Sequence, residues 1–519
     1  MILATPRLLI RADVGPSIGV GHIMRCMAIA QQWQKVGGEV VFVTGDLPGT
    51  LARRLKRNQF LTFQIQNSKA DEADARDTLK IIDAERPGWI LLDGYRFDNH
   101  YQSQFSNQPA FLVVLDDYRH DGHAWADMVI NQNAYGHEIG YDSQGIILAG
   151  PDYALLRSEF VENNENRRPT PTKARRILVT FGGSDPDNWT LETLEVLEEL
   201  NLNRLVIDCV LGPSFQGYRS LDGFKKRTQM CVRFHQNVDR MSHLMNRADL
   251  AVTGGGITCY ELARSGVPAI VVPFVDNQIA IARTMDRLGI MTSIEPTNQS
   301  STKSDFTKKL GRQIKQLIAN PQQRLSMSIR GQQLIDGLGS QRIVNGIRGL
   351  QFPIRRANAD DAVTLLNWRN DPEVRAASFD ESPISLEMMT SWLDTKLKNP
   401  TCQIWLAEDL IGQPVGQIRF DVAEDSQGSN ITIVLDHRYR GLGVGRILIA
   451  SACRKLFSQT EVKQVRALVK PGNTPSERAF KAAGFRAIEP AIVDSKMALQ
   501  FVLDRDRFHL TSKKKLKSA

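Results

Sequence analysis

The sequence predicts an α/β protein in which two parallel-sheet lobes are followed by a smaller α+β domain. Three observations predict it. Apolar runs of β type alternate with helical patterns through about residue 150, the alternation restarts after residue 172, and a different composition begins near residue 352. Such alternation is typical of parallel sheets covered by helices. The 519 residues also exceed what one hydrophobic core organises, and the length alone suggests about three domains.

Apolar runs predict the strands of both lobes. In the first lobe they cover residues 7–12, 39–44, 88–93, 111–116 and 128–131. In the second lobe they cover residues 176–181, 204–211, 229–234, 249–253 and 267–273. A polar stretch with two prolines, residues 162–172, indicates an interdomain linker between them. Ligands of such sheets bind at the carboxyl ends of the strands, so we expect the site in a cleft between the lobes.

The third domain is expected to be a compact α+β unit. Its predicted helices cover residues 360–370, 385–397 and 444–457, and its predicted strands cover 403–408, 414–421, 430–435 and 465–469. The domain boundaries that follow are 1–162 and 173–348 for the two lobes, 353–508 for the third domain and 509–519 for a basic tail.

Composition excludes several classes of protein. Apolar content of 42% and charged content of 24% are near globular averages, and the net charge of +8 is modest and partly carried by the tail. We therefore expect neither nucleic acid nor a membrane as a partner. The six cysteines show no paired spacing, and the first residues lack the pattern of a secretory signal, so a cytoplasmic location is expected. The oligomeric state does not follow from the sequence.

A glycine-rich turn with a histidine at its exit follows the first strand. Gly19 and Gly21 precede His22 and Arg25 at the start of a helical pattern. Glycines let a ligand approach backbone N–H groups, and a helix start favours an anion. The spacing is not the dinucleotide fingerprint, because Met24 stands where its third glycine would fall. In the plainer alternative, His22 only caps its helix.

Three further loops follow strands of the second lobe. They are residues 182–185, with Gly183 and Ser184; residues 254–258, with Gly255, Gly256, Ile257 and Thr258; and residues 276–278, with Asn277 and Gln278. Backbone amides of the second loop could cradle a diphosphate, and Glu261, one turn into the next helix, could accept the hydroxyls of a ribose. Together they predict a pocket for uridine diphosphate.

In order along the chain, these motifs resemble the UDP-sugar hydrolases of pseudaminic acid biosynthesis. The motifs are residues 11–13, 18–25, 93–95, 116–117, 182–185, 254–261 and 276–278, and the resemblance covers residues 5–345. The family is similar in fold to the two-lobed GT-B glycosyltransferases. The resemblance implies cleavage of UDP from 2,4-diacetamido-2,4,6-trideoxy-β-L-altropyranose without a metal.

Such a reaction needs a base for water and fixed positive potential for the departing diphosphate. We assign His22 as the base, since imidazole exchanges protons near neutral pH. Asp13 would orient it or the water, Tyr95 and Asn277 would contact the sugar, and Glu261 would hold the ribose. The other expected substrate contacts are Gly19, Gly21, Arg25, Gly183, Ser184, Gly255, Gly256, Ile257, Thr258 and Gln278. Asp116 and Asp117 lack a matching third ligand, so no metal is expected. For Glu261 an exposed charge, and for Tyr95 a packing role, remain alternatives.

A second glycine loop lies in the third domain between a strand and an apolar helix. Amides of the loop at 440–445 would meet one pyrophosphate. With Asn473, Phe480 and the closing strands, residues 353–505 resemble the GNAT N-acetyltransferases. The resemblance implies acetyl-CoA as cosubstrate and acetylation of the 4-amino group of the same nucleotide sugar. The expected cofactor contacts are Arg440, Gly441, Gly443, Val444, Gly445, Arg446 and Asn473. Many members have a tyrosine acid where Phe480 stands, so the proton donor to the CoA thiolate is left open.

Three alternatives stay open at this point. The first unit is a glycosyltransferase that passes the sugar to an acceptor other than water, or a nucleotide-sugar-binding scaffold without activity. The last unit acetylates a protein amine or another amine. Fold alone does not decide among them.

Overall fold

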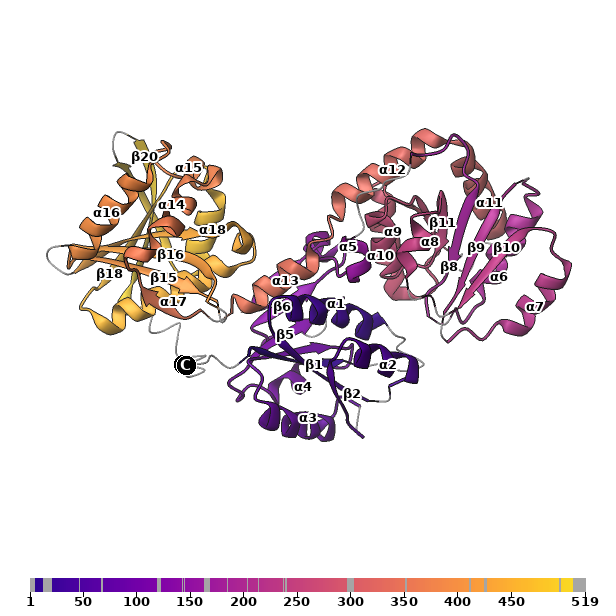
Figure 1. The fold of residues 1–519 in the computed structure, drawn as a ribbon, viewed down its shortest axis with the longest axis horizontal. Helices are drawn as coiled ribbons and strands as arrows, with labels where there is room; N and C mark the ends of the chain where they lie inside the picture. Colours follow the sequence, from indigo (N-terminus) through magenta and orange to yellow (C-terminus); the bar gives the residue numbers. More distant parts are fainter. Residues whose placement is uncertain are drawn as a thin grey trace. The chain divides into compact units, whose positions relative to one another are not determined.

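The computed structural model contains three β-sheets, each packed against helices (Figure 1). The described residues are 5–12, 21–45, 47–66, 69–118, 123–141, 143, 145–162, 169–183, 185–202, 204–212, 214–236, 238, 240–295, 303–350, 352–409, 412–423, 427–493 and 496–506. The chain forms two compact units. One contains Arg7–Phe105 and Leu112–Gln341 with the first two sheets, and the other contains mainly the residues from Arg342 onward with the third sheet. The predicted succession of two α/β lobes and an α+β domain is confirmed.

The first lobe is a seven-stranded sheet with the order β3-β2-β1-β4-β5-β6-β7. Its strands are β1 (Arg7–Ala12), β2 (Glu39–Thr44), β3 (Leu61–Gln64), β4 (Trp89–Asp93), β5 (Phe111–Leu115), β6 (Met128–Asn131) and β7 (Ile146–Ala149). Its helices are α1 (Gly21–Lys35), α2 (Gly49–Arg57), α3 (Glu72–Glu85), α4 (Asn99–Ser103) and α5 (Ser158–Glu162). Helices α1 and α2 lie on one face, and α3 and α4 on the other (Figure 1). Strand β4 is buried along its whole length, as expected for a central parallel strand.

The second lobe repeats this plan with six strands in the order β10-β9-β8-β11-β12-β13. Its strands are β8 (Arg176–Thr180), β9 (Val206–Leu211), β10 (Cys231–Gln236), β11 (Leu250–Thr253), β12 (Ala269–Val271) and β13 (Thr292–Ser293). Its helices are α6 (Trp189–Glu199), α7 (Tyr218–Arg227), α8 (Met241–Met245), α9 (Thr258–Arg264), α10 (Asp276–Arg287), α11 (Lys303–Ala319) and α12 (Pro321–Leu334), and α13 (Gly339–Arg348) follows.

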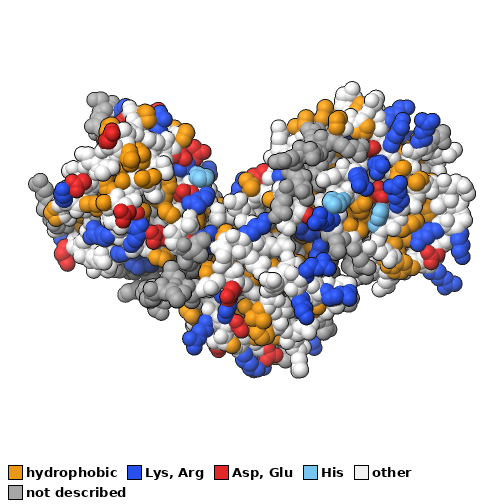
Figure 2. Space-filling model, in the orientation of Figure 1, with side chains coloured by type: hydrophobic (Ala, Val, Ile, Leu, Met, Phe, Trp, Pro, Cys, Tyr) orange, Lys and Arg blue, Asp and Glu red, His pale blue; other side chains and the backbone are white. Residues whose placement is uncertain are grey.

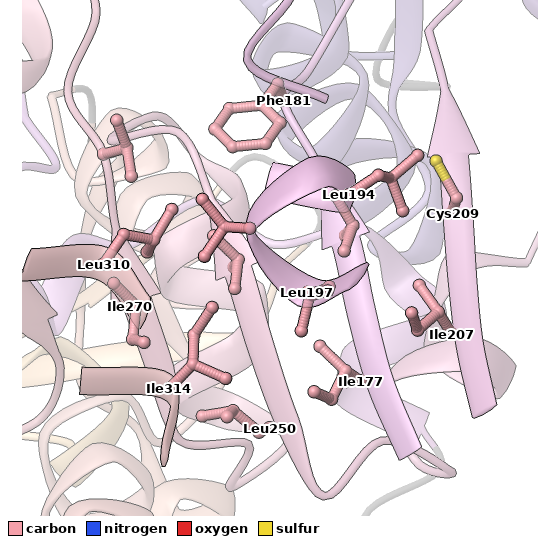
Figure 3. Packing of buried hydrophobic residues seen from close by; sticks show 14 of the residues in the cluster. Ile177, Phe181, Leu194, Leu197, Ile207, Cys209, Leu250, Ile270, Leu310 and Ile314 are labelled. Atoms are coloured by element: carbon pink, nitrogen blue, oxygen red, sulfur yellow. The ribbon is translucent and has the colours of Figure 1, made fainter. Parts of the chain in front are cut away.

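Alternate residues of the second sheet face two separate apolar cores. Ile177 packs with side chains of α6 and α11, such as Leu194 and Ile314 (Figure 3). Its neighbour Leu178 points to the other face, where α9 and α10 pack. This period of two follows from the strand geometry. The second core also contains Phe160 of α5, so residues next to the predicted linker pack against the second lobe.

The third sheet has the order β14-β15-β16-β17-β18-β20-β19 and is mostly antiparallel. Its strands are β14 (Ile354–Arg356), β15 (Cys402–Glu408), β16 (Pro414–Val422), β17 (Gly428–Leu435), β18 (Gln464–Val469), β19 (Arg486–Val493) and β20 (Lys496–Asp504). Its helices are α14 (Ala362–Asn370), α15 (Pro372–Ala377), α16 (Leu386–Lys398), α17 (Val444–Gln459) and α18 (Thr474–Ala482). Only β17 and β18 pair in parallel within the described part of this sheet.

The strand orders locate the positions where ligands are expected. In each parallel sheet the order reverses direction once, between β1 and β4 in the first lobe and between β8 and β11 in the second. Loops diverge at the carboxyl ends of such neighbouring strands and leave room for a ligand. The chain enters α1 after β1, and Asp93 ends β4; the two glycine loops of the second lobe follow β8 and β11.

Two surface observations complete the fold. Among the described residues, no helix combines the length and apolar character that crossing a bilayer requires. On the visible face of the molecule, acidic, basic and hydrophobic side chains are interspersed, including over the first lobe (Figure 2).

A buried ion pair fixes α3 to the first sheet. Arg11 Nη2 and Nε donate to the carboxylate of Asp74 at 2.6 and 3.1 Å, and the Tyr101 hydroxyl donates to it at 2.7 Å. Both charged side chains have no exposed surface. Removing one partner leaves the other charge buried without compensation.

We predict that Asp74→Ala lowers the free energy of unfolding by about 3–5 kcal/mol, measured by urea denaturation. Asp77→Ala is the matched control, because Asp77 lies on the same helix and forms an exposed pair with Lys80 at 2.9 Å. The control substitution should lower the free energy of unfolding by less than about 1 kcal/mol. Equal losses in the two variants would contradict the assigned role of the buried pair.

Candidate active site

His22 and Asp93 form a pair at the first point where the strand order reverses. His22 lies in the first turn of α1, and its Nδ1 is 2.6 Å from Asp93 Oδ1 at the end of β4. Both side chains are buried. Burial alone would raise the pKa of Asp93, but the charge of Arg25, followed by that of His22, and hydrogen bonds from both hold this pKa well below its usual range. Asp93 is therefore ionised and only accepts hydrogen bonds.

This partner fixes which imidazole nitrogen is basic. Because the carboxylate accepts, Nδ1 of His22 carries a hydrogen, and in the neutral imidazole the lone pair is then on Nε2. The histidine ring also meets the ring of Tyr95 edge to face, with centroids 4.7 Å apart. Tyr95 is 39% exposed, so it can reach a ligand while it packs against His22.

Arg25 joins this pair to a second carboxylate. Its Nε and Nη2 donate to Asp93 at 2.8 and 2.5 Å, and its Nη1 donates to both oxygens of Asp117 at 2.7 and 2.8 Å. Burial lowers the pKa of Arg25, but the charges of Asp117 and then Asp93 raise it to a net value above the usual one. Only 5% of the side chain is exposed. We expected Arg25 to contact the substrate, whereas its guanidinium is engaged by two carboxylates.

Asp117 has further partners that fix its orientation. Asn133 donates from Nδ2 to Asp117 Oδ1 at 2.8 Å, and the Tyr95 hydroxyl donates to Oδ2 at 3.3 Å. Asp116, its neighbour, accepts from the Tyr141 hydroxyl at 2.7 Å. Asn131 donates from Nδ2 to that hydroxyl at 2.8 Å and to the Asp117 carbonyl at 3.5 Å, so the two aspartates belong to one connected hydrogen-bond network. Among the described residues, no three His, Cys, Asp or Glu side chains are grouped as metal ligands would be.

The glycine loop after β11 is held by a side chain from α10. Gln278 Oε1 accepts from the backbone N–H of Gly255 at 2.9 Å and of Phe274 at 3.3 Å. The amide of Gly255 is therefore used within the protein, which leaves Gly256, Ile257 and Thr258 as the candidate anion contacts of this loop. The sequence predicted Gln278 as a substrate contact, and the structure places it as a support of the loop.

Glu261 lies in the first turn of α9 and is buried. Its Oε1 accepts from Arg157 Nε at 2.8 Å, and Arg157 also pairs with Glu159 at 2.8 Å. The alternative of an exposed helix charge is thus wrong, because only 7% of this side chain is exposed. Burial lowers the pKa of Arg157, but Glu261 and Glu159 raise it to a net value above the usual one, so the cation persists beside Glu261.

The loop after β8 approaches the loop after β9 very closely. A Cβ built on Gly212 would lie 2.2 Å from the carbonyl oxygen of Gly182, and Ser214 N donates to the Gly183 carbonyl at 2.9 Å. Glycine is therefore required at Gly212 for this packing. Asp185 then accepts from the amides of Trp189 and Thr190 at the start of α6.

Several predicted residues lie outside the described part of the structure. They are Asp13, Gly19, Ser184, the side chain of Asn277 and the tail at 509–519. Gly21 is described, and a Cβ on it would lie 4.0 Å from the Ile257 side chain in the glycine loop of the second lobe. The start of α1 and that loop are thus neighbours.

In the unit that contains the third sheet, β17 and β18 separate toward their carboxyl ends. Their parallel pairing ends at Ile431 and Ala467, although β17 continues to Leu435. The backbone of residues 432–435 is thus left without β18 as a partner on that side. An open strand edge of this kind can bind an extended ligand through backbone hydrogen bonds.

The loop that follows β17 has the backbone of an anion site. Gly441 and Gly443 have φ values of +75° and +70°, a conformation that side chains rarely adopt. Gly443 is the N-cap of α17, a helix of 16 residues. Arg446 in the first turn is partly exposed, and burial lowers its pKa.

Arg440 was expected to contact the cofactor, and in the structure its side chain binds two acidic residues. Its Nη1 donates to Asp371 at 3.0 Å and to Glu373 at 2.8 Å, so its side chain anchors the loop to α15. Nearby, Trp368 Nε1 donates to Asp436 at 3.0 Å, at the end of β17. Trp368 therefore contacts the chain just before the glycine loop.

Two predicted residues of α18 have structural contacts. Asn473 is its N-cap and accepts from Ser476 N at 3.2 Å. Phe480 is 3% exposed and packs against Phe485 and Phe501, with ring centroids 5.1 and 6.4 Å apart. Phe480 is thus part of an aromatic core.

Sequence reasoning missed one support of this loop. Asp409, at the end of β15, accepts from the Tyr439 hydroxyl at 2.8 Å and forms an ion pair with Arg348 of α13. Asn345, also on α13, donates to the carbonyl of Arg438 at 3.0 Å. A signal was available, because an acid at the end of a buried strand needs a buried partner.

Comparisons with known proteins agree with this division. Residues 178–338 match the family model described as the glycosyltransferase family 28 C-terminal domain, and residues 352–486 match that of the acetyltransferase (GNAT) domain. The chain therefore joins a two-lobed GT-B-like unit to a GNAT domain, as predicted.

Three relatives extend over the first unit or the whole chain. An uncharacterized protein of Methanocaldococcus jannaschii is 23% identical and spans 92% of this chain and 96% of its own. Spore coat polysaccharide biosynthesis protein SpsG of Bacillus subtilis is 24% identical and spans 64% and 95%. UDP-2,4-diacetamido-2,4,6-trideoxy-beta-L-altropyranose hydrolase of Campylobacter jejuni is 23% identical and spans 54% and 97%. With the family models, they support a fusion of a UDP-sugar enzyme with a GNAT domain.

Among solved structures, MurG of Acinetobacter baumannii is 17% identical and covers 66% of this chain and 99% of its own, with a TM-score of 0.48.

We predict that His22 occurs as the Nδ1–H tautomer, because Asp93 accepts at that nitrogen. Two-bond ¹H–¹⁵N spectra of histidine-labelled protein should show a pyridine-like Nε2 for His22. Exposed His100, on α4 of the same lobe, is the internal reference and should show the usual tautomer mixture. A pyridine-like Nδ1 in His22 would contradict the pairing.

Proposed function

We propose that the two-lobed unit hydrolyses UDP-2,4-diacetamido-2,4,6-trideoxy-β-L-altropyranose to UDP and the free sugar. The observation that carries this proposal is the buried His22–Asp93 pair at the point where the first sheet reverses its strand order. It provides a histidine whose free nitrogen can accept a proton beside the place where a ligand is expected. The Campylobacter jejuni relative, which bears the name of this activity, supports the choice of substrate.

In the proposed reaction, His22 Nε2 takes a proton from water. The water oxygen then bonds to the anomeric carbon, and the bond from that carbon to the diphosphate oxygen breaks with its electron pair on UDP. Asp93 stabilises the imidazolium that forms, because it stays ionised. Tyr95 and Asn277 contact the sugar, and Asp13 orients the base or the water.

The second lobe holds the nucleotide in this proposal. Amides of Gly256, Ile257 and Thr258 face the diphosphate, and Glu261 accepts from the ribose hydroxyls. Gly183 and Ser184 contribute backbone contacts after β8. Fixed amide dipoles of this kind stabilise a departing diphosphate, and we propose that the reaction needs no metal.

For the third sheet, we propose N-acetylation of the 4-amino group of the precursor UDP-amino sugar. Acetyl-CoA supplies the acetyl group when bound. The open edge of β17 and the loop at 440–445 fit it, since the loop combines left-handed glycines with the start of a long helix. Gly441, Gly443, Val444 and Gly445 would hold the pyrophosphate by their backbones, with Arg446 alongside. Transfer then depends on bringing a neutral amine next to the thioester.

The first test is UDP release from the diacetamido sugar nucleotide. We predict that His22→Ala lowers kcat roughly 10²- to 10⁴-fold, because a general base is lost, and leaves acetylation unchanged. His100→Ala, an exposed histidine of the same lobe, should match the wild type. Release that occurs only after an acceptor alcohol is added would indicate a glycosyltransferase instead.

The second test is acetylation of the 4-amino sugar nucleotide. Gly443→Ala places a Cβ at φ +70°, which costs roughly 1–2 kcal/mol and should raise the KM for acetyl-CoA about tenfold. UDP release should not change. Gly412→Ala is the matched control, since φ is +77° there, the position is open and it lies outside the loop. If His22→Ala or Gly443→Ala abolished both reactions, the assignment of two sites would be wrong.

A further inference from the structure

Tyr260 connects the two lobes through its hydroxyl group. It lies on α9, four residues after the last loop glycine, and is 1% exposed within an apolar core. Its hydroxyl accepts from the backbone N–H of Ala134 at 3.0 Å and donates to Asn133 Oδ1 at 3.3 Å. Both partners follow β6 of the first lobe. A phenylalanine would fill the same core, so the contribution of the hydroxyl is these two hydrogen bonds.

From Asn133, hydrogen bonds continue without a break to the candidate base. Asn133 Nδ2 donates to Asp117 at 2.8 Å, Arg25 bridges Asp117 and Asp93, and Asp93 accepts from His22. All the side chains in this series are buried. Buried networks of this kind have a defined geometry, because an unmatched donor or acceptor cannot turn to water.

We propose that Tyr260 is a positioning residue that couples the nucleotide-binding loop of the second lobe to His22. Helix α9 starts at that loop, so the placement of the loop sets the placement of the Tyr260 hydroxyl. Because Asn133 binds both the hydroxyl and Asp117, the position of the hydroxyl sets the position of Asp117. Arg25 binds both carboxylates, so the position of Asp117 in turn sets that of Asp93. His22 then has its productive orientation when the second lobe is correctly placed. This inference rests on the proposed hydrolase function.

The coupling has a direct test in Tyr260→Phe, which removes one oxygen and keeps the ring. The kcat for UDP release should fall roughly 10- to 100-fold, since a misplaced base costs that much. The affinity for UDP alone, measured by calorimetry, should stay within about twofold of wild type, because the loop itself is intact. Tyr218→Phe, an exposed tyrosine of the second lobe, is the matched control and should change neither quantity.

A second variant separates coupling from packing. Asn133→Ala interrupts the same series from the first lobe, and the double variant with Tyr260→Phe should be no slower than the slower single variant. Independent, multiplying losses would overturn the proposal, as would a wild-type kcat for Tyr260→Phe. A parallel loss of UDP affinity would also overturn it, because Tyr260 would then act on the nucleotide site alone.

His22→Ala, assayed beside these variants, separates the two proposals. If the wild type releases no UDP, the proposed function fails. If the wild type releases UDP and His22→Ala still does, the assignment of the base fails, and the coupling to it fails as well. If His22→Ala is inactive and Tyr260→Phe is fully active, only the coupling fails.

Discussion

The arrangement of the first site depends on one guanidinium shared by two buried carboxylates. Arg25 brings together Asp93, at the end of β4, and Asp117, which follows β5. Without this cation, two negative charges would be buried beside each other, and the ends of the central strands would repel. The planar, five-donor geometry of arginine suits this task, because one edge meets Asp93 while the remaining amino group meets Asp117. A lysine, with all its donors on one nitrogen, could not contact Asp93 through two nitrogens and Asp117 through a third.

The strands differ in how well the sequence predicted them. The central strands were recognised because they are continuous apolar runs: β1, β2 and β6 were predicted at their observed bounds. β3 was missed because it is a half-exposed edge strand with only short apolar content. β10, also an edge strand, was placed two residues early for the same reason.

The contacts within the site were less predictable than the fold. The sequence predicted His22 as the base and Asp13 as the residue that orients it or the water, whereas the carboxylate that contacts His22 in the described structure is that of Asp93. This contact depends on strand order, because β1 and β4 are neighbours although 76 residues of chain separate Ala12 from Trp89. Arg25 follows His22 by three residues on α1, a spacing that puts both on one face. That spacing was the available sign that the two share a carboxylate. In the GNAT unit, the glycine loop was predictable because its glycines are close together in the sequence. The ion pair between Arg440 and Asp371 is a long-range contact that no local pattern reveals.

The contact between Asp409 and α13 bears on how the gene can be divided. The acetyltransferase family match begins at residue 352, yet Arg348 and Asn345, which precede it, hold Asp409 and the Arg438 carbonyl. A fragment cut at the family boundary would keep every residue of the glycine loop, but Asp409 beneath it would lose the cation that pairs with it, while the Tyr439 hydroxyl still donates to it. The working limit of the GNAT half therefore lies in α13 (Gly339–Arg348), a helix that falls between the two family matches, and fragments for expression should begin upstream of that helix.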